Sequence, residues 1–288
     1  MVFEDFGCRI AVDEFNVESD YYFLTHCHYD HMKGFPKNWD RNKPLILSNI
    51  SRDVLVSRGY NLNEFNVAVD AGESLDFTEH DFSVQFIDAN HCIGSLIYVF
   101  FNNRKKIIHT GDFRFNDTIK NDIKSYRNPD KLYLDTTYNH PNYVFPSQEE
   151  TISEVIKILR NSDNKEIFLG VYEIGKDKLL MSVYEIFGEP FYVSAPKFKI
   201  YKNIGLEKLV TKDKESTRFR AYSRQYMEGK YFRKPEDSVV IIPTGWAIDK
   251  MKNGKFHYVP YSEHCDFIEL NNFIEFVKPE KIVSICEF

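Results

Sequence analysis

Hydrophobic residues along this chain gather in short runs separated by polar turns. Some runs are continuously apolar, as in 21–24 (YYFL), and others alternate apolar with polar residues, as in 82–89 (FSVQFIDA). Both patterns are typical of β-strands, buried on two faces or on one. They predict strands at 21–24, 44–48, 82–89, 96–101, 106–110, 131–134, 167–171, 239–243, 256–261 and 282–286.

Helices are expected between these runs. The pattern predicts helices over 50–59, from 147–150 to 160, from 175–176 to 186, and from 266 to 277, where Asp266 is the expected N-cap. Residues 1–20 indicate short strands and turns, and 197–234 mixed short elements. The chain contains no internal repeat and no low-complexity tract.

Several predicted strands end in a histidine or a carboxylate. The ligand-type residues at four such ends are His26 with His28, His91, Asp112 and Asp135. Layered α/β folds assemble active sites from loops at strand ends. Four endings of this kind therefore indicate one site.

The densest cluster is the segment His26-Cys27-His28-Tyr29-Asp30-His31. Because a strand alternates its faces, His26 and His28 point the same way and are able to chelate one metal ion. Asp30 and His31 follow as the chain leaves the strand, free to turn toward a second ion. These ligands suit zinc and tolerate manganese or iron. The alternative is a solvated histidine-rich loop.

Composition predicts a soluble, intracellular protein. Of the 288 residues, 43% are hydrophobic, but no run approaches the roughly 18 apolar residues that span a bilayer. The N-terminus MVFEDFGCRI is not a secretory signal. The five cysteines form no CxxC pair, which indicates neither a disulfide framework nor a cysteine zinc site. We expect a reducing compartment.

Charge is unevenly distributed. The net charge is −6, yet residues 197–234 hold twelve Lys/Arg and four acids, a local charge of +8. Seven aromatic residues are interleaved with them, a mixture that suits a surface tracking phosphates and stacking bases. The alternative is a solvated face over an ordinary aromatic core.

Five motifs in order carry a resemblance to a known family. THCHYDH, DANHCIGS, HTGDFRF, LYLDTTY with PSQEE, and VPYSEHCDF resemble the motifs of the β-CASP branch of metallo-β-lactamase-fold nucleases, within the DNA cross-link repair group. The resemblance runs from Ala11 to Cys286. FLGVYEIGKDKLL and VTKDKESTRFRAYSRQY look closer to the Apollo-type 5′ exonucleases, whereas HCHYDHMKG is more similar to the Artemis type.

The resemblance implies an α/β fold with a four-layer αββα core. It places the first part of that core at 1–147, a β-CASP insertion at 148–240 that caps the active-site groove, and the second part of the core at 241–288. The basic, aromatic segment falls inside the insertion.

The resemblance also implies roles for the strand-end residues. His26, His28 and His91 would hold a first metal, Asp112 would bridge to a second, and Asp30 and His31 would belong to the second ion. The expected cofactor is one or two Zn²⁺ ions, with Mg²⁺ or Mn²⁺ as alternatives at the second site. Catalytic roles are implied for Asp30, Asp112, Asp135 and His264.

Two of these residues have open alternatives. Asp135 orients water or ligates the second ion. His264 contacts the scissile phosphate or protonates the leaving oxygen, or it is a buried, hydrogen-bonded residue at a helix start. His109 is expected to be structural, and the other histidines to lie on the surface.

Lys176, in IGKD at a predicted helix start, is a candidate anchor for a terminal 5′-phosphate. Tyr261 and Ser262 are candidate phosphate neighbours. A Gly-Lys dipeptide is more often a simple turn.

Three positions depart from the family pattern. Ile93 stands where proline is usual, and Tyr29 replaces a small or basic residue between two ligands. Cys286 occupies the place of a histidine ligand in RNA-cleaving relatives. We interpret Cys286 as an apolar filler, which favours DNA as the substrate.

The expected function is a 5′-to-3′ DNA exonuclease anchored by a 5′-phosphate, acting on single-stranded or duplex ends in cross-link repair or telomere processing. The alternatives are an Artemis-like endonuclease for hairpins and overhangs, an RNA nuclease, a small-thioester or lactam hydrolase, and a non-enzymatic scaffold. The resemblance implies nuclear localisation and no membrane association. The chain ends directly after the last predicted strand, so we expect no telomere-protein docking tail.

Overall fold

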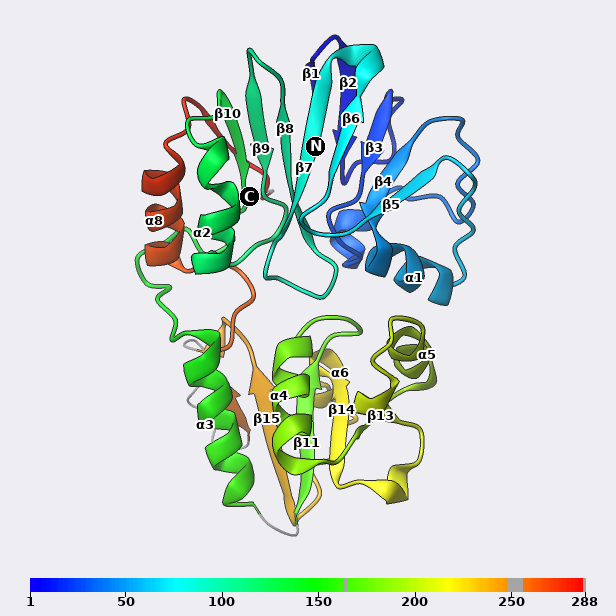
Figure 1. Cartoon of the computed structure of the whole chain (residues 1–288). Helices are drawn as coiled ribbons and strands as arrows, with labels where there is room; N and C mark the ends of the chain where they lie inside the picture. The colour runs from blue at the N-terminus through cyan, green and yellow to red at the C-terminus, as the bar shows by residue number, and fades with distance from the viewer. Residues whose placement is uncertain (163–164, 248–255, 287–288) are drawn as a thin grey trace. The chain divides into compact units, whose positions relative to one another are not determined.

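The computed structural model describes residues 1–162, 165–247 and 256–286. The chain divides into two compact units, one made of Met1–Asn142 with His264–Phe288 and the other of Tyr143–Glu263 (Figure 1). In the described part of the chain, no helix is long and apolar enough to cross a membrane.

Two mixed sheets form the centre of the first unit. One has the order β1-β2-β3-β4-β5, with β1 (Val2–Asp5), β2 (Cys8–Val12), β3 (Tyr21–Phe23), β4 (Leu45–Ser48) and β5 (Asn66–Val69). The other has the order β17-β10-β9-β8-β7-β6, with β6 (Ser74–Phe77), β7 (Phe82–Asp88), β8 (Leu96–Phe101), β9 (Lys106–His109), β10 (Lys131–Leu134) and β17 (Ile282–Ser284).

Strand alternation explains the layers of this unit. On β8, Leu96, Tyr98 and Phe100 face a core shared by both sheets, whereas Ile97 and Val99 face a second core. The second core is closed by α2 (Asp117–Ile123) and α8 (Phe267–Val277). Helix α1 (Asn49–Ser57) packs against β4 and β5 of the first sheet (Figure 1). The α/β fold and the αββα layering expected from the sequence are confirmed.

Short 3-10 turns complete the first unit. They are η1 (Tyr29–Met32), η2 (Thr78–His80) and η3 (Lys124–Tyr126). Helix α8 begins with a capping box in which the side chains of Asp266 and Glu269 each accept a hydrogen bond from the other's backbone N–H. This cap confirms the predicted helix start and fixes the backbone two residues after His264.

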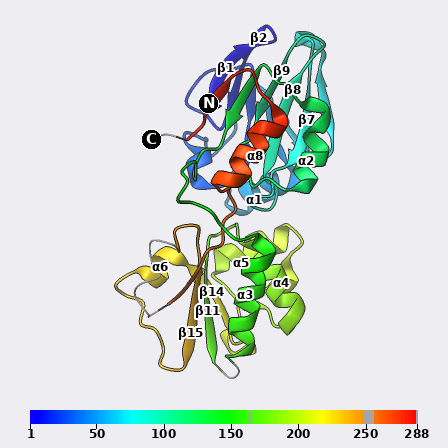
Figure 2. The same ribbon diagram turned by 90° about the vertical axis from the view of Figure 1, so that its left-hand side faces the viewer.

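The second unit is built on a six-stranded parallel sheet of order β13-β12-β14-β11-β15-β16. Helices α4 and α6 lie on opposite faces of it (Figure 2). The strands are β11 (Glu166–Val171), β12 (Phe191–Tyr192), β13 (Val210–Thr211), β14 (Phe219–Ser223), β15 (Ser238–Pro243) and β16 (His257–Val259). The helices are α3 (Gln148–Arg160), α4 (Asp177–Phe187), α5 (Ala195–Asn203) and α6 (Arg224–Glu228), with 3-10 turns η4 (Glu207–Leu209) and η5 (Lys214–Ser216).

The boundaries of the second unit differ from those predicted. It begins at 143, five residues before the expected 148, and extends to 263 beyond the expected 240. The reason for the second difference is strand pairing, because β16 pairs with β15 in the sheet of this unit. The described residues between 241 and 263 therefore belong with it.

Candidate metal centre

The segment that follows β3 carries the first group of candidate ligands. Strand β3 lies between β2 and β4 in a parallel arrangement, and the chain then turns through η1. The Thr25 carbonyl accepts a hydrogen bond from the Leu96 N–H at 3.0 Å, which ties this exit to β8. His26 is fully buried, whereas the neighbouring His28 and His31 are partly exposed. The segment thus places its imidazoles at the C-terminal end of β3, beside the start of β8.

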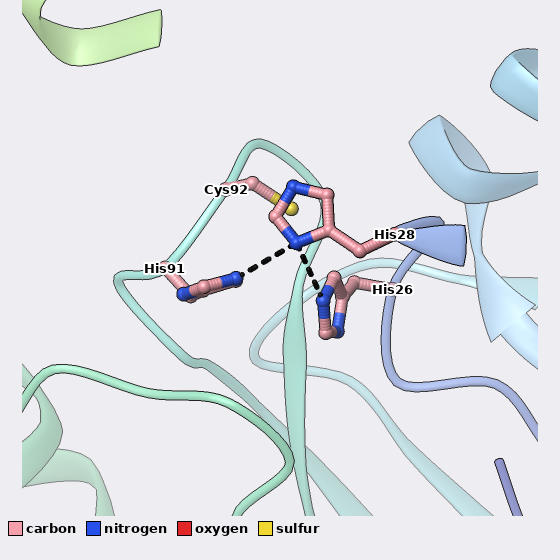
Figure 3. Close-up of side chains that lie close together, drawn as sticks. All are labelled: His26, His28, His91 and Cys92. Carbon is pink, nitrogen blue, oxygen red and sulfur yellow. Dashed lines mark hydrogen bonds between the residues drawn. The ribbon is translucent and has the colours of Figure 1, made fainter. Parts of the chain in front are cut away.

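Three histidines converge at one point, as the sequence predicts. His28 Nδ1 lies 2.9 Å from His26 Nε2 and 3.1 Å from His91 Nε2 (Figure 3). Two nitrogen ligands of a tetrahedral zinc ion, each about 2.0–2.1 Å from the metal, are separated by roughly 3.3–3.4 Å. The three nitrogens are thus spaced almost as a metal requires.

Protonation also favours metal binding at His26. Burial, and then the neighbouring histidines, hold the pKa of His26 well below its ordinary value. A neutral imidazole is the form that binds a metal ion. The donor set therefore fits a divalent cation.

Asp112 lies among four imidazoles. Its Oδ2 is 3.2 Å from His31 Nε2, 3.5 Å from His91 Nε2, 3.7 Å from His26 Nε2 and 3.9 Å from His264 Nε2. Burial alone would raise the pKa of Asp112, but the histidines, His31 foremost, hold it well below its ordinary value. Asp112 belongs to two of the candidate ligand groups in the described residues, and its bridging role stays a prediction.

Gly111 allows Asp112 to reach this position. Its φ is +52°, and a Cβ there would lie 2.9 Å from the Thr25 side chain. Glycine is the residue that adopts this conformation without strain and permits such a close approach.

A residue absent from the predicted set, Asp13, orients the ligands. Asp13 Oδ2 lies 2.7 Å from His31 Nδ1 and accepts a hydrogen bond from Thr25 Oγ1 at 2.6 Å. Thr25 Oγ1 in turn lies 3.0 Å from His26 Nδ1. Carboxylates behind ligand histidines fix the tautomer and the ring orientation. Asp13 directly follows β2, so the strand-end pattern that identified the other carboxylates also applies to it.

Asp135 and His264 form a second polar pair beside the ligands. Asp135 Oδ2 lies 2.7 Å from His264 Nδ1, and Asp135 Oδ1 accepts hydrogen bonds from the Thr137 N–H at 3.0 Å and from Thr137 Oγ1 at 2.6 Å. Among the ligand groups found in the described residues, His264 appears with His91 and Asp112, whereas Asp135 appears in none. Asp135 is therefore placed to orient His264.

Cys286 has a different environment from the expected apolar one. Its thiol lies 3.5 Å from Asp135 Oδ1 and accepts a hydrogen bond from the Thr136 N–H at 3.3 Å. Burial, followed by the charge of Asp135, raises the pKa of Cys286. The thiol belongs to the polar surroundings of Asp135, so the interpretation as an apolar filler is wrong.

Two further residues of this unit complete the comparison with the sequence. The Asp30 side chain is 80% exposed, and its Oδ2 lies 3.9 Å from His31 Nε2, so its role at a second ion stays a prediction. The buried thiol of Cys92 belongs to the ligand group of His26, His28 and His91, and it is absent from the ligands predicted from the sequence. Figure 3 shows Cys92 beside the histidines.

His109 lies outside these ligand groups. Its Nδ1 accepts a hydrogen bond from the Gly111 N–H at 3.1 Å, and burial lowers its pKa to about 3. The structure therefore gives it the structural position that was expected.

The phosphate candidates lie in the second unit. Lys176 is buried, and its Nζ donates to Glu263 Oε2 at 3.0 Å. It lies 5.0 Å from the ring centroid of Tyr261, and Ser262 is buried close by in sequence. Because its ammonium already has a carboxylate partner, the phosphate role of Lys176 stays a prediction.

The basic segment is divided between core and surface. Lys197 and Arg220 are buried, and Arg220 pairs with Glu166 at 2.8 Å. Tyr226 and Tyr231 are exposed. The buried part belongs to the core of the unit, and the role of the exposed aromatic residues in nucleic-acid binding stays a prediction.

Comparisons with known proteins agree with this geometry. A family described as DNA repair metallo-beta-lactamase matches residues 205–287. The 5′ exonuclease Apollo of Gallus gallus is 29% identical over 98% of this chain, and the DNA cross-link repair protein SNM1 of Arabidopsis thaliana is 30% identical over 91%. Over most of its length the chain is similar to proteins of the DNA cross-link repair group.

The similarity covers most of this chain but only part of the length of each relative. The chain spans 62% of the Gallus protein and 60% of the Arabidopsis protein. It also spans 21% of DNA ligase 6 of Arabidopsis thaliana, to which it is 30% identical over 91% of its own length.

A solved structure shares the fold. The crystal structure of a protein of unknown function from Enterococcus faecalis V583 superposes with a TM-score of 0.64, covering 92% of this chain and 75% of that chain at 14% identity. At this identity the likeness speaks for the fold alone.

Proposed function

We propose that this chain is a metal-dependent 5′-to-3′ DNA exonuclease that acts on ends carrying a 5′-phosphate. The observation that carries the proposal is the convergence of His26, His28 and His91 beside Asp112, with the Asp135–His264 pair next to them. Relatives named as DNA repair proteins and as a 5′ exonuclease support both the substrate and the polarity.

The chemistry of the site supports phosphodiester hydrolysis. A divalent ion held by the three histidines, with zinc the proposed ion, would supply an activated water at neutral pH and neutralise charge on the phosphate. Two of the ligand groups in the described residues, His26 with His28, His91 and Cys92 and His26 with His31 and Asp112, suit one or two ions without using His264.

The protein's own residues supply proton transfer. Because a carboxylate accepts hydrogen bonds, Asp135 holds the Nδ1 proton of His264 and leaves Nε2 directed toward Asp112, 3.9 Å away. A protonated His264 is stabilised by Asp135 and carries at Nε2 a proton for the leaving 3′ oxygen. Asp13 keeps His31 in its orientation throughout.

The cellular role we propose is DNA interstrand cross-link repair in the nucleus, for which the names of the relatives give support. Telomere processing stays a prediction. RNA cleavage is the alternative that a specific observation favours, because Cys286 lies beside Asp135 rather than in an apolar setting.

One oligonucleotide in four forms tests the proposal. The forms are 3′-labelled single-stranded DNA with a 5′-phosphate, the same with a 5′-hydroxyl, a DNA hairpin, and the RNA equivalent, each with and without a chelator. We expect a ladder from the 5′-phosphorylated DNA that the chelator abolishes. We expect the His28→Ala variant to be inactive. The control is His257→Ala, which changes an exposed histidine outside the site and should leave the protein active.

The other outcomes reassign the function. Cleavage inside the hairpin irrespective of the 5′ end indicates an endonuclease. Degradation of RNA alone indicates an RNA nuclease. If the wild-type protein leaves all four forms intact with zinc, manganese or magnesium supplied, the proposal is wrong.

A further inference from the structure

An exposed aromatic side chain lies between two candidate ligands. Tyr29 is 67% exposed, although it follows His28 and precedes Asp30 in the chain. Neighbouring Cα atoms are about 3.8 Å apart, so the backbone of Tyr29 lies at the metal centre. Leaving a large ring in water at this place forgoes the stabilisation that burial would give.

The ring of Tyr29 is supported by an arginine. The Arg58 guanidinium Cζ lies 4.6 Å from the ring centroid, within the range of a cation–π contact. Arg58 is the C-cap of α1, where its N–H donates to the Val54 carbonyl at 3.0 Å. The backbone of Arg58 is therefore held at the end of α1.

Arg58 is also bound to the ligand segment itself. Its Nη1 donates to the Cys27 carbonyl at 2.6 Å and contacts Met32 Sδ at 3.4 Å. These residues flank Tyr29 on both sides along the chain. A ring held in this way needs little further ordering when a planar partner stacks on it, because preorganisation lowers the entropic cost of binding.

We propose that Tyr29 is a stacking platform for the nucleobase next to the scissile phosphodiester. The inference rests on the proposed nuclease function and adds a binding residue to that site. Every base has a π-face, so stacking on a tyrosine is tolerant of sequence. Purines offer the larger face, so the platform gives a modest preference for a purine at that nucleotide.

Tyr29 would act on binding rather than on the chemical step. Stacking on an aromatic side chain contributes about 1–3 kcal/mol per base by alanine substitution, which corresponds to roughly 5- to 150-fold in affinity. Removal of the ring should therefore raise KM by that factor with a smaller change in kcat. A merely structural role would lower the apparent kcat in proportion to the folded fraction and leave KM unchanged.

The test uses Tyr29→Ala, with Tyr29→Phe as the matched control that keeps the ring. Each protein is assayed on 5′-phosphorylated DNA that carries a normal or an abasic nucleotide at the reacting end. We expect Tyr29→Ala to lose about 5- to 150-fold in affinity on the normal DNA. Tyr29→Phe should retain wild-type affinity, and all three proteins should bind the abasic DNA equally weakly.

A second readout is independent of cleavage. A 2-aminopurine at the terminal position is titrated with each protein in excess EDTA, and the fluorescence quenching reports stacking. Wild type and Tyr29→Phe should quench, and Tyr29→Ala should not.

Two failures are distinguishable. If the wild-type protein neither binds nor cleaves nucleic acid, the proposed function fails. If it cleaves DNA and Tyr29→Ala matches it on normal and abasic substrates alike, the stacking role of Tyr29 is overturned and the proposed function is kept.

Discussion

Replacing Asp135 by asparagine tests the role of the Asp135–His264 pair with the smallest change of shape. The carboxylate accepts hydrogen bonds on both oxygens, from Thr137 on one side and from His264 on the other. An asparagine offers one oxygen and one NH₂ group, so it satisfies only one side. Two donors from Thr137 favour keeping the amide oxygen there.

As a consequence, the neutral form of His264 changes its tautomer. The NH₂ group then faces His264 Nδ1, which must accept, and the ring proton moves to Nε2 in the neutral form. The variant also loses the negative charge that stabilises a protonated His264. Proton transfer by a positioned side chain contributes about 10²–10⁴-fold, so we expect the cleavage rate of Asp135→Asn to fall by a factor in this range.

Single-turnover cleavage of 5′-phosphorylated DNA measures this loss, and mass spectrometry of the native protein measures metal content. Asp135 belongs to none of the ligand groups in the described residues, so the metal bound by His26, His28 and His91 should be retained. Thr137→Val is the matched control. It removes one donor to Asp135 and leaves the His264 contact, so we expect a loss of only about 1 kcal/mol in stability.

A double variant decides whether Asp135 acts through His264. We expect Asp135→Asn combined with His264→Ala to be no slower than His264→Ala alone, because residues that act as a unit are not additive. A near wild-type rate for Asp135→Asn would show that Asp135 is not needed to position His264. So would two losses that multiply in the double variant.

Three other perturbations have defined outcomes. Asp13→Asn should lower metal affinity by about 10–100-fold, measured by competition with a chromophoric chelator. Asp13 accepts from the Thr25 N–H on Oδ1 and from Thr25 Oγ1 and His31 Nδ1 on Oδ2, whereas an amide has only one accepting oxygen. Gly94→Ala should destabilise the first unit by roughly 1–3 kcal/mol in urea unfolding, since its Cβ would lie 2.7 Å from Ile50 Cβ at a φ of +81°. Lys197→Met should change how the free energy of unfolding depends on pH. Burial lowers the pKa of Lys197 to about 8, so below pH 8 the buried charge lowers the free energy of unfolding of the wild type. This cost disappears as the pH rises toward 10.5 and the folded protein loses the proton.

Two of these perturbations have a matched control. Gly59→Ala has a φ of +76° with open space around its Cβ, so it isolates the backbone cost. For Lys197, the difference in unfolding free energy between wild type and Lys197→Met should grow in favour of the wild type by up to about 3 kcal/mol between pH 8 and 10.5. The exposed Lys199→Met should show no such trend. A wild-type metal affinity for Asp13→Asn would contradict the orienting role of Asp13.

The strands of the core could be predicted from their apolar patterns, whereas the αββα layering was implied by the family resemblance. The predicted strands 96–101 and 131–134 coincide with β8 and β10. Strands β5 and β6 were missed, since they are short and partly exposed and so lack a clear apolar pattern. Strand β14 contains the buried Arg220, whose pairing with Glu166 on another strand cannot be read from local sequence.

The ligand residues could be predicted for the same reason that they converge, namely that they lie at strand ends. The surroundings of Cys286 and the end of the second unit could not be predicted in this way, because they depend on pairing between distant segments. Strands β10 and β17 are parallel with Leu134 opposite Ser284, and this register brings Cys286 beside Asp135. Likewise, β16 pairs with β15, which moved the domain boundary. Register of this kind is a property of the folded sheet.

Metal reconstitution of the cleavage reaction tests whether the histidine centre is the catalytic site. The protein is stripped with a chelator, and 5′-phosphorylated DNA is added together with increasing zinc or manganese. We expect activity to be absent in the stripped protein and to return as one or two ions are bound, in the wild type and not in His28→Ala. Full cleavage by the stripped protein, or equal cleavage by His28→Ala, would contradict the account.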